Sequence, residues 1–120
     1  MWVSGSEFEK LVGEALDGLP AVFAEAVENV SVIVEEEPSA EDLEAVGLDP
    51  RQDTLFGLYQ GVALPERGLG YTSLPDRIVI YRLPILEACG SREQIVEEVL
   101  LTIRHELGHY FGLDEDELPP

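Results

Sequence analysis

His105, Glu106 and His109 lie in the pentapeptide His-Glu-Leu-Gly-His near the end of the 120-residue chain. Side chains four residues apart on a helix lie on the same face, so both imidazoles can reach a single ion. Neutral imidazole is a good ligand for Zn²⁺, and a catalytic zinc takes three protein ligands and leaves the fourth position for water. Glu106 is rotated by about 100° from His105, so its carboxylate is placed to contact that water rather than to complete the ligand set. The pattern indicates a zinc site with a general base beside it.

The chemistry that these residue types support is hydrolysis. Zinc lowers the pKa of a bound water to about 7, and a carboxylate can take the proton while the water attacks a polarised carbonyl. The simpler interpretation is a pair of surface histidines near the end of a helix. The chain contains two histidines in all, and both are in the motif, which favours the metal site.

A long helix is predicted to carry the motif. Ser91 is a good N-cap, and apolar residues at helical spacing follow as far as Phe111. Nearly every residue between Val99 and Ile103 is apolar, which predicts a helix buried within the domain. Gly112 is expected to end the helix in the left-handed conformation.

A third ligand is expected in the acidic segment after Gly112. The spacing H-E-x-x-H-x-x-G-x-x followed by a ligand, as in the metzincin proteases, leads to Glu115. Asp116 is the close alternative, and a solvated acidic tail is the interpretation without a ligand. Tyr71 and, second, Tyr110 are candidate donors to a developing oxyanion, although most tyrosines belong to the core or its rim.

The rest of the chain is predicted to contain three further helices and three strands. The predicted helices are Glu7–Leu16 with Ser6 as N-cap, Ala21–Glu28, and Ala40–Val46 with Ser39 as N-cap. The predicted strands, from their β-branched and aromatic residues, are Val30–Glu35, Leu55–Val62 and Asp76–Arg82. Glycines within the second of these strands predict bulges or the close approach of another backbone. Ala63–Pro75 is expected to be a long connection, and Leu83–Gly90 leads into the histidine-bearing helix. The whole chain, residues 1–120, is predicted to be one domain.

The composition limits the partners. There are 25 acidic and 7 basic residues, giving a formal net charge of −18. Such a surface repels phosphate backbones and anionic lipids, so we expect no nucleic-acid or membrane partner. It favours basic peptides, although solubility alone is the simpler explanation. With no signal-peptide pattern and no long apolar run, a cytoplasmic location is expected. Cys89 is the single cysteine and is expected to be buried without a disulfide partner.

Three blocks of sequence between Leu55 and Leu118 carry a resemblance to a known family. They are Leu-Phe-Gly-Leu-Tyr-Gln-Gly-Val with Pro-Glu-Arg-Gly shortly after it, Leu-Pro-Asp-Arg-Ile-Val-Ile-Tyr-Arg, and Ile-Arg-His-Glu-Leu-Gly-His-Tyr-Phe-Gly-Leu-Asp-Glu-Asp-Glu-Leu. In these blocks the chain resembles the small bacterial zincin-like metallopeptidases with the minimal zincin fold. The chain departs from the metzincins because its only methionine is Met1, so no methionine-containing turn lies under a metal.

The resemblance implies a fold and a set of roles. It implies an α+β domain in which a short mixed sheet of three to four strands packs with N-terminal helices and a long buried C-terminal active-site helix, with an edge strand bordering the cleft. It also implies His105 and His109 as zinc ligands, Glu106 as base and a carboxylate near position 115 or 116 as third ligand. The sequence therefore predicts a metallopeptidase with one zinc per chain, acting on peptide or protein substrates. The alternative is a catalytically silent metal-binding or protein-interaction module that retains the same fold.

Overall fold

The computed structural model describes residues 1–61 and 76–112 of the chain. Within these ranges the chain forms helices and strands in mixed order, which confirms the predicted α+β class. The elements are α1 (Gly5–Asp17), α2 (Ala21–Val27), β1 (Val30–Glu35), α3 (Ala40–Ala45), β2 (Gly57–Gln60), β3 (Asp76–Tyr81), α4 (Arg82–Ala88) and α5 (Arg92–Tyr110).

The three strands form a mixed sheet with the order β1-β3-β2. β1 runs parallel to β3, with Val30 opposite Asp76, and β2 runs antiparallel to β3, with Gly57 opposite Ile80. The central strand β3 has both faces covered, because Ile78 through Tyr81 are all buried. A strand covered on both faces reads as a continuous apolar run, which is how this segment appears in the sequence. Among the described residues, β2 is an edge of the sheet.

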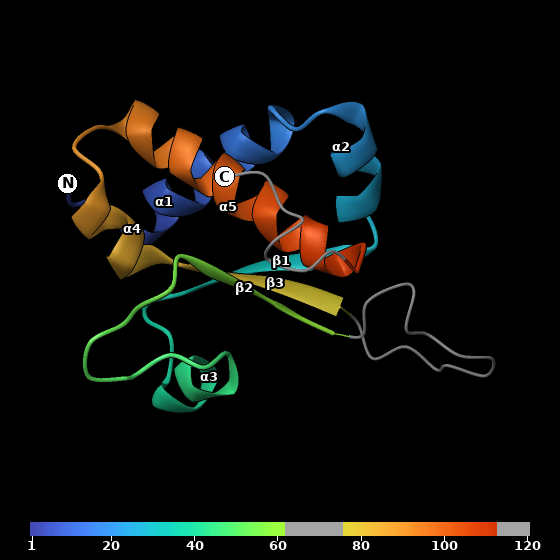
Figure 1. Ribbon diagram of the computed structural model, residues 1–120. Helices are drawn as coiled ribbons and strands as arrows, with labels where there is room; N and C mark the ends of the chain where they lie inside the picture. The colour runs from blue at the N-terminus through green and yellow to red at the C-terminus, as the bar shows by residue number, and fades with distance from the viewer. Residues whose placement is uncertain (62–75, 113–120) are drawn as a thin grey trace.

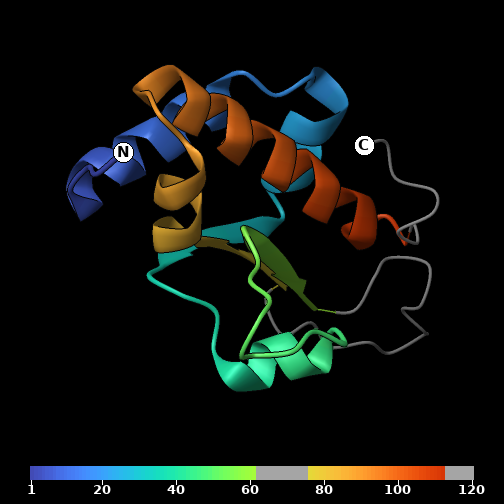
Figure 2. The ribbon, with the colours of Figure 1, turned by 60° about the vertical axis from the view of Figure 1, so that its left-hand side comes forward.

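Helices cover the two faces of the sheet unequally. Figures 1 and 2 show α1, α2, α4 and α5 on one side of the sheet and the short α3 on the other. Ile78 and Ile80 of β3 belong to the hydrophobic core that includes residues of α1 and α5. On the opposite side, the Tyr81 hydroxyl donates a 3.1 Å hydrogen bond to Asp42 of α3. Burial, and then the neighbouring Asp42 carboxylate, raise the pKa of Tyr81 well above its usual range. The hydrogen bond ties α3 to the end of the central strand.

Helix α5 packs against both β2 and β3, as predicted for the helix that carries the motif. Its N-cap is Ser91, whose hydroxyl accepts a hydrogen bond from the Gln94 amide at 3.1 Å. The helix has one buried and one open face, because Leu101 is 46% exposed while Val99 and Ile103 are fully buried. The prediction of a helix covered all round is therefore too strong. The open face is what leaves the histidines accessible.

The predicted start of helix α1 and the predicted bounds of strand β2 are wrong. Helix α1 begins at Gly5 with Ser4 as N-cap, not Ser6, and the Ser4 hydroxyl accepts from the Glu7 amide at 3.2 Å. Ser4 is followed three residues later by Glu7, which is the capping-box spacing. Strand β2 covers Gly57–Gln60, which is shorter than the predicted Leu55–Val62.

Helix α4 was not predicted. It covers Arg82–Ala88, so Arg82 is the first residue of a helix and not the last residue of β3. Pro84 is its third residue, where a proline removes no helical hydrogen bond, because amides of the first turn have no acceptor within the helix. Arg82 is buried and forms an ion pair with Glu36 at 2.7 Å, and it also donates to the Val3 carbonyl. This arginine therefore joins the start of α4 to the N-terminal segment and to the end of β1.

Two further expectations concern single features. Cys89 is buried against the core, as predicted, and burial raises the pKa of its thiol. None of the helices in the described ranges combines the length and hydrophobicity that a membrane span requires.

The close contact between β2 and α5 generates a stability prediction. A Cβ atom at Gly57 would lie 2.5 Å from Thr102 Cγ2 and 3.0 Å from the Val79 carbonyl oxygen. We expect Gly57→Ala to lower the free energy of unfolding by about 1–3 kcal/mol, because strand or helix must shift to make room. The matched control is Gly13→Ala in α1, where an added Cβ meets nothing within 4 Å and should stabilise by about 0.5–1 kcal/mol. Urea denaturation measures both changes, and equal stability of Gly57→Ala and wild type would contradict the tight contact.

Candidate metal centre

The structure brings the three motif residues together on the last turns of α5. The potential ligand atoms of His105, Glu106 and His109 all lie within 4.8 Å of one another. Two atoms bound to one tetrahedral zinc lie about 3.3 Å apart, given Zn–N bonds of about 2.0–2.1 Å. Small side-chain rotations are therefore sufficient to bring the imidazoles onto one ion, and the residues fit a metal.

The two imidazoles face the open side of the helix. Their ring centroids are 5.2 Å apart with an interplanar angle of 78°. The His105 side chain is 35% exposed and His109 is half-buried. Both rings are thus held beside each other by the helix while remaining accessible from solution. This is the arrangement that the four-residue spacing predicts.

Glu106 differs from the histidines because it is buried, with 7% of its surface exposed. A buried carboxylate needs hydrogen bonds to replace its lost hydration. Glu106 Oε1 accepts a 2.8 Å hydrogen bond from the backbone amide of Tyr59 in β2. Its other oxygen, Oε2, lies 3.9 Å from His105 Nε2. One oxygen is thus bound to the strand, and the other faces the imidazole of His105.

Contacts with α5 hold strand β2 in this position. The Tyr59 ring packs edge-to-face on Tyr110 of α5, with centroids 6.0 Å apart. Gly57 allows the strand to approach the Thr102 side chain of the same helix, so the close contact that α5 makes at this glycine is with a side chain, whereas the sequence predicted a bulge or the approach of another backbone. The amide of Tyr59 is the functional group that sequence reasoning missed. A backbone N–H carries no residue signature, and the glycine was the one indication that something packs closely on this strand.

Three of the predicted site residues cannot be placed. Tyr71, Glu115 and Asp116 lie outside the described residues, so their roles stay predictions. Tyr110, the second candidate oxyanion donor, is buried in the hydrophobic core and packs on Tyr59 and Phe111. Packing accounts for the burial of its ring.

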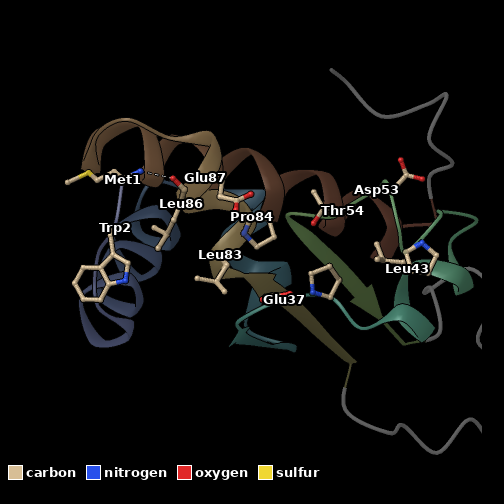
Figure 3. A pocket seen from close by; sticks show the side chains of 12 residues that line it. Met1, Trp2, Glu37, Leu43, Asp53, Thr54, Leu83, Pro84, Leu86 and Glu87 are labelled. Atoms are coloured by element: carbon tan, nitrogen blue, oxygen red, sulfur yellow. Dashed lines mark hydrogen bonds between the residues drawn. The ribbon is translucent and has the colours of Figure 1, made fainter.

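A separate open pocket lies elsewhere in the described part of the chain. It has a volume of about 470 Å³ and lies between the N-terminal segment, the region around α3, and α4 (Figure 3). Its lining combines apolar side chains such as Trp2 and Leu83 with carboxylates such as Glu37 and Glu87. No residue of α5 lines this pocket, so it is not part of the metal centre.

The observations so far define a class of protein: an α+β fold whose longest helix presents an H-E-x-x-H metal motif beside the edge of a mixed sheet. Residues 27–120 match the family model for zincin-like metallopeptidases. The chain belongs to the zincin-like metallopeptidase family, which confirms that the resemblance found in the sequence is to zincin-like metallopeptidases. A comparison with curated proteins found no significant match, so the assignment rests on the family model together with the fold and the motif.

The end of α5 generates a prediction about metal binding. Gly112 has a φ of 84°, and its amide donates to the His109 carbonyl at 2.9 Å. We expect Gly112→Ala to cost about 1–2 kcal/mol of stability, because an L-residue is strained in this conformation. Fraying of the turn that carries His109 should also weaken the binding of Zn²⁺ measured by calorimetric titration.

Gly47 supplies the matched control. It has a φ of 80° at the end of α3, where an added Cβ would meet nothing within 4 Å. Gly47→Ala should lose a similar amount of stability in urea denaturation and bind Zn²⁺ as the wild type does. Equal Zn²⁺ affinities of the two variants would show that the end of α5 does not position His109.

Proposed function

We propose that this protein is a zinc-dependent metallopeptidase in which His105 and His109 hold the metal and Glu106 is the general base. The observation that carries the proposal is the orientation of Glu106. Its carboxylate is buried, one oxygen is bound to the Tyr59 amide, and the other faces His105. Membership of the zincin-like metallopeptidase family supports the same assignment.

The donor set fits zinc. Two neutral imidazoles and a carboxylate are ligand types that catalytic zinc sites use. When bound, zinc supplies Lewis acidity, which lowers the pKa of water and polarises a carbonyl. We propose Glu115 as the third ligand, with Asp116 as the alternative, and one zinc per chain.

In the proposed reaction Glu106 moves the proton. Its other oxygen, Oε2, takes a proton from the attacking water and passes it to the leaving amine nitrogen, while Oε1 keeps its hydrogen bond to Tyr59. Burial removes bulk water that would otherwise compete for the carboxylate. Tyr71 is our candidate for the donor that stabilises the oxyanion. The charge of −18 favours basic peptide or protein substrates through long-range attraction.

Metal content and cleavage test this function together. Protein purified without chelator or histidine tag should contain about one zinc per chain by mass spectrometry, and His109→Ala should contain none. Glu106→Gln should retain zinc, because the amide replaces a base and not a ligand. We expect its peptide cleavage rate to fall by about 10²–10⁴-fold, the usual contribution of a general base.

The outcomes separate the proposal from its alternative. Zinc-loaded wild type that cleaves no peptide in a broad library would favour a metal-binding or interaction module without catalysis. In that case His109→Ala should lose stability that metal provides, and Glu106→Gln should behave as wild type. If the wild type takes up no zinc even after incubation with it, the metallopeptidase assignment is wrong.

A further inference from the structure

Glu106 is close enough to the histidines to be a metal ligand itself, since its carboxylate belongs to the same group of atoms within 4.8 Å. We propose that the Tyr59 amide of β2 holds Glu106 away from the metal and thereby keeps this residue a base. Tyr59 is then a positioning residue that acts through its backbone. The proposal rests on the metal site of the proposed function and adds to it the group that decides the role of Glu106.

The sheet leaves the Tyr59 amide available for this purpose. The Tyr81 amide donates to the Phe56 carbonyl at 2.9 Å, and bonded pairs alternate with non-bonded pairs along an antiparallel ladder. In the register of β2 and β3, Leu58 opposite Val79 is therefore a bonded pair, whereas Tyr59 opposite Ile78 is not. The Tyr59 N–H points away from β3, and its acceptor is Glu106 Oε1.

The distances show what ligation by Glu106 would require. Glu106 Oε2 lies 3.9 Å from His105 Nε2, whereas two ligands of one tetrahedral zinc lie about 3.3 Å apart. Closing this gap requires the carboxylate to move while Oε1 is bound to the Tyr59 amide, and we expect that movement to break this hydrogen bond. The hydrogen bond that is lost involves a charged acceptor, and such bonds are roughly twice as strong as neutral ones.

The strand that provides the amide is itself fixed. The ring of Tyr59 packs on Tyr110, and Gly57 is in close contact with Thr102. Both contacts are with α5, the helix that carries Glu106. The packing of β2 on α5 therefore fixes the Tyr59 amide relative to the Glu106 carboxylate. The distance between the two groups is set by this packing and not by the hydrogen bond alone.

The test compares Tyr59→Pro with Tyr59→Ala, each loaded with Co²⁺ as the probe. Proline removes the N–H at an edge position where no ladder hydrogen bond is lost, while alanine removes the ring and keeps the N–H. The visible absorption of bound Co²⁺ reports its ligands. We expect wild type and Tyr59→Ala to share one spectrum and Tyr59→Pro to show a different one. We also expect Tyr59→Pro to bind Co²⁺ about tenfold or more tightly, because groups that hydrogen-bond to the residues of a metal site change metal affinity on this scale. Adding Glu106→Gln to Tyr59→Pro should abolish both differences.

Each remaining outcome decides the question. Identical spectra for wild type and Tyr59→Pro would overturn the role of the amide and leave the metal site intact. A spectral change that persists with Glu106→Gln would also overturn it, because the new ligand would not be Glu106. If the wild type binds no Co²⁺ or Zn²⁺, the metal site and this inference fail together. Should Tyr59→Pro not fold, the hydroxy-acid analogue of tyrosine at position 59 replaces the N–H by an ester oxygen and keeps the ring.

Discussion

The packing of β2 against α5 is the constraint on which the candidate site depends. The helix alone supplies two imidazoles on one face, but a helix surface does not bury a carboxylate or fix its direction. The strand does both, because the close contact at Gly57 and the ring pair of Tyr59 and Tyr110 bring a backbone amide to Glu106. The sheet and the remaining helices can be understood as the support that keeps this strand against this helix.

The sequence predicted what depends on local signals. Three predicted features depend only on neighbouring residues: the two histidines close together on one helix, the N-cap at Ser91 and the left-handed Gly112. The structure contains all three. Strand β1 was predicted with its bounds because four of its six residues, Val30, Val32, Ile33 and Val34, are β-branched. Helix α4 was not predicted, although its Pro84 lies in the first turn, where a proline is tolerated.

The bond between Tyr59 and Glu106 could not be predicted from the sequence. Its partners are 47 residues apart, and its donor is a backbone group that every residue except proline possesses. The buried role of Arg82 is similar. Its ion pair with Glu36 and its bond to the Val3 carbonyl join segments far apart in the sequence. Contacts of this kind are fixed by the tertiary fold, so residue type alone does not reveal them.

Some of these contacts join residues close in sequence and others join residues far apart, and this difference affects the order in which the site forms during folding. His105 and His109 are neighbours on one helix, which forms on the scale of microseconds or less, whereas pairing of distant strands is slower. A chain with α5 formed and β2 not yet docked presents both imidazoles together with an unanchored carboxylate. Such a species can capture metal without orienting a base. On the proposed function, hydrolytic capacity therefore arises only when the fold is complete, and a partly folded copy does not attack the newly made chains around it.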